Sequence, residues 1–445
     1  MLTLLYNAKI VTGAECSDGY ILIKDAHIAA IGAGPVPGEL SRLADEAIDC
    51  EGDMLMPGAI DTHVHFRDPG LTAKGDIASE SRAAVAGGVT SYIDMPNTRP
   101  ATVTTADWEA KMERAAEVSM ANYAFFIAAT NDNLTTLLTV DYTRVPGIKL
   151  FLGSSTGNML VDNASTLEQL FASAPAIIAV HAEDEETINR RRQELTDLAA
   201  GRPLPVRLHS SLRPAEACVK ASGRALELAR RYGTRLHLLH LSTAEELTLL
   251  GGDRNITAET CPHYLLFTDA DMDRLGSRIK CNPSIKSQAD RIALVRGVAD
   301  GTIDTIATDH APHLPADKEG DLLTAASGMP GIQFSLPVML ELLDGRPERV
   351  AALMSENPAR IFGIANRGFL LAGFHADIVR VRRLREPITI TDADVISKCG
   401  WTPYAGIQTH YKVITTWVNG KKAFDNGSVA HRSSAAPLRF LNSSK

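Results

Sequence analysis

The sequence lacks the features that mark membrane and secreted proteins. No run approaches the roughly 18 uninterrupted apolar residues of a transmembrane helix. The opening residues, MLTLLYNAKIVTG, have neither the basic nor the long apolar segment of a secretory signal. The six cysteines are scattered, without a CxxC pair, which argues against a disulfide framework or a cysteine zinc site. We therefore expect a cytoplasmic protein with reduced thiols.

An excess of positive charge is also missing. Lys and Arg number 45 against 53 Asp and Glu, which gives a formal net charge of −8. This balance argues against a general partner among nucleic acids or membrane surfaces. Hydrophobic residues at 45% and charged residues at 22% are ordinary globular values. We expect a globular protein whose partner is a small-molecule substrate.

The two ends of the chain share one pattern. Residues 1–55 contain short alternating segments broken by Gly and Asp, and residues 365–445 contain similar segments with a hairpin signal at Asn419-Gly420. Neither end is long enough to form a stable domain alone. The pattern predicts that they pair into one small β-rich domain.

Residues 56–364 show a different pattern, in which apolar strand-like runs alternate with helix-like segments. This alternation is typical of parallel strands with crossover helices, and eight such units match a (β/α)8 TIM-like barrel. A doubly wound open sheet is the alternative, but no Gly-rich dinucleotide loop follows any strand. The eight expected strands are 54–65, 89–97, 123–129, 147–152, 176–184, 235–242, 256–264 and 302–310.

Polar residues lie at or near the ends of these expected strands. In a barrel such residues converge on the carboxyl-terminal face, where the active sites of these folds lie. They are His63, His65, Asn97, Lys149, His181, His240, His263 and Asp309.

The histidines in this set are typical metal ligands. His63 and His65 alternate along a strand, so both imidazoles face one side and can reach one cation. A lone buried histidine such as His181 or His240 is more often a core residue, but two of them beside an HxH pair favour ligation. With Asp309, the donors exceed what one tetrahedral zinc needs, which predicts two metals.

Lys149 and Asp309 fit the same site. An ammonium buried beside two cations is strongly disfavoured, whereas a carbamate formed from Lys149 and carbon dioxide would be an anionic bridge. Pairing with a carboxylate is the alternative for this lysine. Asp309 can take a proton from a metal-activated water and return it to a leaving nitrogen; a helix N-cap is its alternative role.

Several motifs resemble the dihydroorotase family of the amidohydrolase superfamily over nearly the whole chain. The HxH pair and the late Asp are shared with hydantoinases and allantoinases, but HFRDPG, MPNT and TDHAPH together are more specific. The motifs occupy residues 61–70, 95–98, 259–263 and 308–313.

The resemblance implies a site and a reaction. The reaction is the reversible cyclisation of N-carbamoyl-L-aspartate to (S)-dihydroorotate in pyrimidine biosynthesis, and the protein would be a homodimer. Two Zn²⁺ ions would be bridged by N6-carboxylated Lys149. By resemblance, His63, His65 and Asp309 hold one zinc, His181 and His240 the other, Arg67, Asn97 and His313 bind the substrate carboxylate and nearby polar atoms, and Asn282 contacts the ring.

One segment differs from the corresponding segment in some members of the dihydroorotase family. Those relatives carry an Asp after the fourth strand as the bridge, whereas this chain has GSSTG at 153–157. The bridge is therefore assigned to Lys149. Two other hypotheses about the function remain. The protein could be another cyclic amidohydrolase, namely an allantoinase or a dihydropyrimidinase (hydantoinase). It could also be a non-catalytic dihydroorotase-like partner protein.

Three smaller expectations complete the analysis. His237 precedes His240 by three residues and should face the helices, while His263 would orient a ligand or substrate group without binding metal. The loop at 314–328 is long, polar and Gly-punctuated, and we expect it to close over the barrel mouth. The remaining histidines are assigned to the surface or the second domain, namely His27, His209, His375, His410 and His431.

Overall fold

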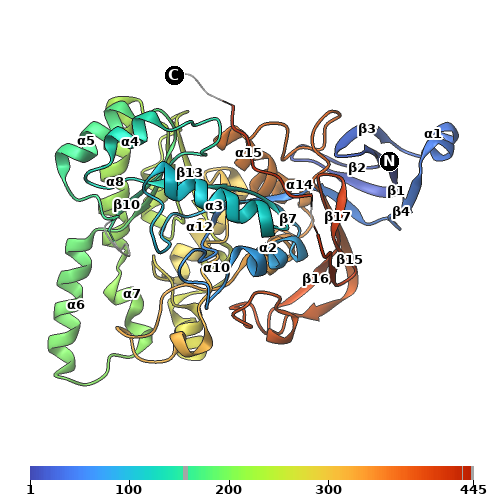
Figure 1. Cartoon of the computed structure of the whole chain (residues 1–445). Helices are drawn as coiled ribbons and strands as arrows, with labels where there is room; N and C mark the ends of the chain where they lie inside the picture. The colour runs from blue at the N-terminus through green and yellow to red at the C-terminus, as the bar shows by residue number, and fades with distance from the viewer. Residues whose placement is uncertain (154–158, 433, 442–445) are drawn as a thin grey trace.

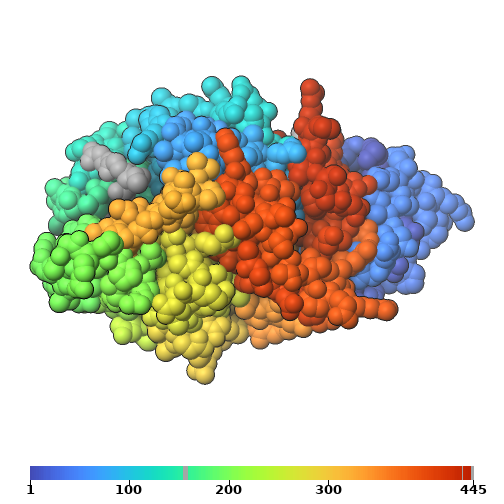
Figure 2. Space-filling view, turned by 90° about the horizontal axis from the view of Figure 1, so that it is seen from below, coloured from blue at the N-terminus to red at the C-terminus, as the bar shows by residue number. Residues whose placement is uncertain are grey.

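The computed structural model describes residues 1–153, 159–432 and 434–441. Residues 154–157 of the departing GSSTG segment therefore lie outside the described part. A barrel occupies one half of the molecule and a twisted sheet the other (Figure 1). The space-filling view shows that the molecule is elongated (Figure 2). Among the described residues, no helix is long and apolar enough to cross a membrane.

The barrel predicted from the sequence is confirmed. Its strands pair in parallel in chain order, in one run from β6 to β8 and another from β9 to β14. An isolated parallel bridge between Val64 and His310 brings the two ends of the series together. The strands are β6 (Ala59–Val64), β7 (Val89–Asp94), β8 (Asn122–Phe125), β9 (Ile127–Ala128), β10 (Ile148–Leu152), β11 (Ile178–Ala182), β12 (Leu236–Leu238), β13 (Ile256–Thr260) and β14 (Thr305–Ile306).

Helices cover the outside of the barrel. Two of the helix-like segments between the expected strands form the long helices α3 and α8, and α8 ends at Gly233, whose φ of +68° suits a left-handed cap. The helices are α1 (Gly38–Leu43), α2 (Ile77–Ala86), α3 (Thr105–Val118), α4 (Leu134–Thr139), α5 (Ala164–Ser173), α6 (Glu185–Ala199), α7 (His209–Leu212), α8 (Ala215–Tyr232), α9 (Ala244–Thr248), α10 (Pro262–Leu266), α11 (Met272–Leu275), α12 (Gln288–Asp300), α13 (Ser335–Leu342), α14 (Pro347–Ala351) and α15 (Asn357–Phe362).

The two ends of the chain share one sheet, as expected. Strands from the amino-terminal segment pair with strands from the carboxyl-terminal segment through β5 and β15, which run antiparallel. A turn at Asn419-Gly420 joins β16 to β17, as the hairpin signal predicts. The strands are β1 (Leu2–Val11), β2 (Cys16–Lys24), β3 (His27–Ala33), β4 (Glu46–Asp49), β5 (Met54–Pro57), β15 (Ile378–Thr389), β16 (Gln408–Val418), β17 (Lys421–Asp425) and β18 (Ser428–Val429).

The division into domains 1–55 plus 365–445 and 56–364 stays a prediction. Its first boundary falls inside β5, which belongs to the composite sheet and leads directly into barrel strand β6. The chain therefore passes from one part to the other without a linker.

A buried polar cluster joins the composite sheet to the barrel. Arg367 donates to Asp377, and both side chains are buried. Asp377 also accepts from the Asn122 amide of β8 at 3.1 Å, and Asn419 donates to Asn122 at 2.8 Å. Because these buried hydrogen bonds join Asn122 of the barrel to Asp377 and Asn419 of the composite sheet, the cluster fixes one arrangement of the two parts.

Replacing Asp377 by alanine should destabilise the protein by about 3–5 kcal/mol, because it leaves the Arg367 charge buried without its carboxylate. Asp18→Ala is the matched control, since Asp18 pairs with Lys9 at an exposed site and should cost about 1 kcal/mol or less. Denaturant unfolding measures both. Equal loss in the two variants would contradict the assignment.

Candidate metal centre

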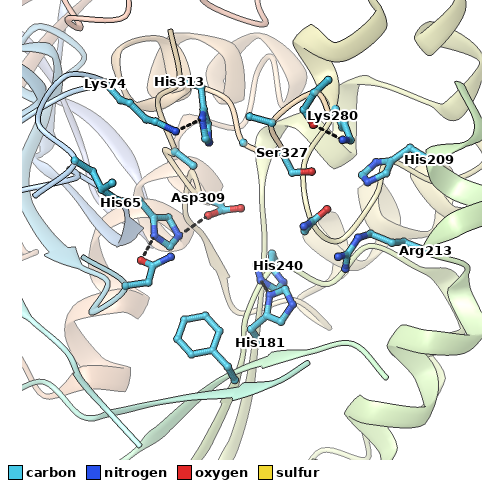
Figure 3. A pocket seen from close by; sticks show the side chains of 18 of the residues that line it. His65, Lys74, His181, His209, Arg213, His240, Lys280, Asp309, His313 and Ser327 are labelled. Carbon is cyan, nitrogen blue, oxygen red and sulfur yellow. Dashed lines mark hydrogen bonds and ion pairs between the residues drawn. The ribbon is translucent and has the colours of Figure 1, made fainter. Parts of the chain in front are cut away.

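The cavity lies at the carboxyl ends of the barrel strands. It has a volume of about 790 Å³ and is lined by residues from seven strands or the loops after them. Five predicted ligands line it together, namely His63, His65, His181, His240 and Asp309, and Lys149 lines it as well. The structure thus brings together the side chains that the sequence places at separate strand ends (Figure 3).

His63, His65 and Asp309 form one donor group. Asp309 Oδ1 lies 3.0 Å from His65 Nε2 and 3.4 Å from His63 Nε2. One donor atom from each residue lies within 4.8 Å of the others, the spacing of a group that could hold a metal ion. Burial alone would raise the pKa of the Asp309 carboxyl, but the imidazoles of His63, His65 and His240 outweigh burial and hold the pKa well below its ordinary value. The carboxylate is therefore ionised, as a ligand must be.

The outer nitrogens of the two histidines are held by other side chains. His63 Nδ1 donates to Glu259 Oε1 at 2.8 Å, and His65 Nδ1 donates to Asn97 Oδ1 at 2.6 Å. These bonds leave both Nε2 lone pairs facing Asp309, which is the tautomer that metal ligation requires. Burial lowers the pKa of His65 to about 4, so its imidazole is neutral at pH 7.

His181 and His240 form a second donor group. His181 Nδ1 lies 2.9 Å from His240 Nε2, and the rings are nearly perpendicular. The His240 ring is 5.2 Å from the His63 ring, so the two groups adjoin. Burial lowers the pKa of both imidazoles. Two neutral imidazole nitrogens that face one another fit a shared cation.

Lys149 is 1% exposed, lies on β10 next to the strand of His181, and lines the same cavity as both donor groups. Its Nζ lies 4.6 Å from the centroid of the Phe151 ring. Burial lowers the pKa of the amine to about 7, although Asp309 and Glu259 act in the opposite direction. A large share of this amine is neutral at pH 7, and a neutral amine can react with carbon dioxide.

The donor set fits a metal site. Buried polar atoms normally have partners, yet His240 Nδ1 has no hydrogen-bond partner among the described residues. Nitrogen and carboxylate donors at this spacing are those that zinc prefers. The part of the predicted metal site that the structure supports is a group of His63, His65 and Asp309 that could hold a metal ion.

Three site residues have left-handed backbone conformations. The φ values are +67° at Arg67, +42° at His240 and +46° at Asp309. Non-glycine residues in this region cost about 1–3 kcal/mol each and concentrate at functional sites. At each of these positions the chain turns sharply away from its strand and the side chain reaches the cavity.

The predicted substrate-binding residues also line the cavity. Arg67 Nη2 lies 3.2 Å from His313 Nε2, and Lys74 Nζ lies 3.0 Å from His313 Nδ1. Burial and these two cations lower the pKa of His313 to about 2, so the ring is neutral. A neutral imidazole accepts at only one nitrogen, so it cannot satisfy both cations. Asn282 lines the cavity too, and its buried Oδ1 lacks a partner among the described residues.

Two expectations about histidines are wrong. His237 faces the barrel interior, where its Nε2 lies 3.5 Å from Glu259 Oε2. Counting alternate faces fails because β12 ends at Leu238, so His240 no longer follows strand geometry. His209 is not at the surface: it is 1% exposed and lines the cavity, because α7 folds back beside the barrel mouth.

The roles of His263 and of the 314–328 loop stay predictions: the loop lines the cavity, whereas His263 is not among the described residues that line it. His263 lies on α10 with both ring nitrogens buried and without hydrogen-bond partners among the described residues. The loop contributes residues 322–328 to the cavity wall. Lys318 fastens it by donating to the carbonyls of Ala326 and Gly328, each at 2.7 Å.

The sequence analysis missed two carboxylates that support the histidines. Glu259 contacts His63 as described above. Glu183 Oε2 lies 3.2 Å from His181 Nε2 and accepts from Arg213 at 2.5 Å. Both glutamates are fully buried, and an acidic residue within an apolar strand run is the signal that could have found them.

Replacing Glu259 by glutamine should weaken metal binding about 10–100-fold, because His63 loses the anion that orients it. Glu246→Gln is the matched control: Glu246 is also buried but accepts from Ser222 and Thr243 outside the cavity. Metal titration with a competing chelator measures both. The role of Glu259 would be refuted by equal affinities in both variants.

Comparison with known proteins assigns the chain to a protein family. The model of the amidohydrolase family matches residues 54–423. The chain belongs to the amidohydrolase family. This member is 34% identical to a dihydroorotase of Halobacterium salinarum over 95% of its own length and 98% of that protein. It is 33% identical to an allantoinase of Bacillus velezensis, with coverage of 97% and 95%.

Solved structures of the family confirm the fold. The L-hydantoinase (dihydropyrimidinase) of Arthrobacter aurescens superimposes with a TM-score of 0.91 at 27% identity, covering 98% of this chain and 99% of that one. The dihydropyrimidinase of Brevibacillus agri gives 0.88 at 24% identity, with coverage of 99% and 98%. The resemblance to dihydroorotases is confirmed, alongside similarity to allantoinases.

Proposed function

We propose that this amidohydrolase-family protein is a dihydroorotase, which interconverts N-carbamoyl-L-aspartate and (S)-dihydroorotate in pyrimidine biosynthesis. Its relatives by sequence and structure are dihydroorotases, allantoinases and hydantoinases, and at that level the chain is a cyclic amidohydrolase. The choice among these substrates is the proposal. We further propose that it acts as a cytoplasmic homodimer.

The proposal that dihydroorotate is the substrate rests on the two cationic side chains near His313. Arg67 and Lys74 both approach this neutral ring, which can accept from only one of them. Lys74 also lies 3.5 Å from Asp317, so Arg67 is the cation without a carboxylate partner within ion-pair distance among the described residues. A carboxylate placed between them would accept from both, and the planar guanidinium of Arg67 suits a carboxylate. Dihydroorotate carries such a group, whereas allantoin and dihydrouracil do not.

The residues of the cavity then have distinct roles. Arg67 and His313 bind the substrate carboxylate, and Asn97 offers its Nδ2 while its Oδ1 holds His65. Asn282 pairs with the ring amide through its unpartnered Oδ1.

His63, His65 and Asp309 would hold one Zn²⁺, His181 and His240 the other, and N6-carboxylated Lys149 would lie between them. When bound, the two ions would polarise the ring carbonyl and supply an acidic water near neutral pH. Asp309 accepts the proton of the attacking water, and the ring C–N bond breaks as Asp309 delivers that proton to the ring nitrogen. Cyclisation follows the same path in reverse.

Steady-state assays with dihydroorotate, allantoin and dihydrouracil test the proposal. We expect turnover of dihydroorotate that is lost on prolonged chelation and restored by zinc. Preference for allantoin or dihydrouracil would assign the protein to another cyclic amidohydrolase. No turnover of any of the three by the metal-loaded protein would leave the non-catalytic reading.

A further inference from the structure

A connection within the composite sheet reaches the barrel beside the proposed substrate site. Residues 390–407 join β15 to β16, and we call them the connecting segment. Trp401 lies in this segment, is 3% exposed and is not among the described residues that line the cavity. Its indole Nε1 donates to the backbone carbonyl of His313 at 2.7 Å. The proposed reaction gives this hydrogen bond no role, although it links the sheet to a residue of the proposed substrate site.

The ring of His313 is closely confined. Its Nε2 and Nδ1 face the cationic groups of Arg67 and Lys74, as Figure 3 shows for Lys74. The ring also lies against Gly328, where an added Cβ would be 3.1 Å from His313 Cδ2. Arg67 donates in addition from Nε to the Pro312 carbonyl at 3.2 Å. Because the ring and the guanidinium are both tied to the backbone of these two neighbouring residues, a shift of that backbone would move both.

Two donors from different parts of the protein hold this backbone. Arg67 comes from the barrel and binds the Pro312 carbonyl, whereas Trp401 comes from the connecting segment and binds the His313 carbonyl. A buried carbonyl that loses its donor is destabilised, so it moves toward another partner. Without the indole N–H, Arg67 would be the one side chain among the described residues that still donates to these two carbonyls. Arg67 must also bind the substrate.

The connecting segment is anchored to the barrel on the amino-terminal side of Trp401. The Lys398 amide donates to Glu80 Oε1 at 3.1 Å, and the Glu80 side chain is fully buried. Glu80 Oε2 in turn accepts from His310 Nε2 at 2.8 Å. His310 follows Asp309 in the chain, so this anchor holds the same strand end that provides a predicted metal ligand.

A second anchor lies on the carboxyl-terminal side. Arg278 donates to the Thr402 carbonyl at 2.8 Å and to Asp392 Oδ1 at 2.7 Å. Its guanidinium carbon lies 5.1 Å from the centroid of the Trp401 ring, which is a cation–π distance. The indole is therefore held both along the chain and across its face, and this keeps its N–H directed at the His313 carbonyl.

We propose that Trp401 is a positioning residue of the substrate site. Its hydrogen bond to the His313 carbonyl keeps the His313 ring and the Arg67 guanidinium in the arrangement that binds the substrate. The group bound there is the substrate carboxylate, and this part alone rests on the proposed function. The composite sheet thus contributes to substrate binding through the connecting segment, although Trp401 lies outside the cavity lining.

Trp401→Phe tests the hydrogen bond, because it keeps an aromatic ring beside Arg278 and removes the indole N–H. We expect KM to rise about 2–10-fold, the usual effect of one neutral hydrogen bond, and kcat to stay within about twofold. A change in KM alone reports the loss of binding that ground state and transition state share. Steady-state kinetics with whichever of dihydroorotate, allantoin and dihydrouracil the protein turns over measure both constants.

Trp108→Phe is the matched control. Trp108 is 2% exposed, its Nε1 donates to the Phe125 carbonyl at 2.9 Å, and the Arg144 guanidinium carbon lies 4.8 Å from its ring centroid. It lies on α3 and is not among the described residues that line the cavity. Both variants lose the same kind of bond, so denaturant unfolding should show similar destabilisation, whereas KM should rise only in Trp401→Phe.

Arg278→Met is a second variant in case Trp401→Phe does not fold, since the Arg278 side chain is 37% exposed. It removes an anchor and leaves the indole, and KM should rise about 2–5-fold. Unchanged KM in the folded variants would overturn the proposal, as would an equal rise in Trp108→Phe. If the protein turns over allantoin or dihydrouracil but not dihydroorotate, the proposed function fails while this comparison still stands. No turnover of any of the three would overturn both.

Discussion

Lys149→Ala should lose most of the bound metal and nearly all turnover. The residue lies on β10 and lines the same cavity as both donor groups, and its removal takes away the proposed bridge between the ions. The loss should exceed the about 10–100-fold effect typical of a residue that only orients a ligand. Metal analysis of the purified variant and assay of dihydroorotate turnover measure the two effects. A short carboxylic acid such as propionate should restore part of the activity by filling the gap.

Lys318→Met is the matched control for this experiment. Lys318 is also buried, but its amine donates to loop carbonyls and does not line the cavity. Its variant should retain metal even if loop contacts weaken. Growth with ¹³C-labelled bicarbonate should further give a carbamate carbon signal that disappears in Lys149→Ala. Full metal content and turnover in Lys149→Ala would refute the bridge.

The barrel could be predicted from the sequence because its strands are buried on both faces. Runs such as IKLFL at 148–152 are continuous in apolar character apart from the residue that reaches the cavity. Parallel strands have such continuous apolar sequences because helices cover their outer surface and both faces are buried. The side chains that line the cavity could be predicted for the same reason: a histidine at the end of such a run stands out, and parallel strands bring their carboxyl ends to one face.

The supporting residues were harder to find because no periodic pattern places them. His209 and Arg213 come from a short helix and the residue after it, between α6 and α8, and only the path of that connection brings them to the cavity. Lys280 lies in an irregular segment before α12, held to the 314–328 loop by its own amine. Contacts of this kind depend on tertiary packing, which a local reading of sequence does not contain.

His237 illustrates a different limit. The alternation of faces holds only while the backbone stays extended, and β12 has three residues. At His240 the φ of +42° reverses the direction of the side chain. Strained residues at active sites are thus the places where a rule of regular structure fails, since function requires a conformation that the pattern does not encode.

Asp309→Asn should lower turnover by about 10²–10⁴-fold, the usual effect of removing a general acid–base. Asn keeps an oxygen at the position that faces His63 and His65, so metal should remain largely bound, and KM should change little because Arg67 and His313 still hold the carboxylate. An amide cannot accept the proton of the attacking water.

The matched control is Asp304→Asn, on the approach to the same strand. Asp304 accepts from the Ala258 amide at 2.8 Å and does not line the cavity, so its variant should turn over dihydroorotate normally. The comparison separates proton transfer from general damage to β14. If Asp309→Asn kept its metal and turned over within about twofold of the unchanged protein, proton transfer would have to be assigned to another residue. Loss of metal in step with activity would instead show that the negative charge of Asp309 is needed to hold the ion, and the loss of turnover would then not report on proton transfer.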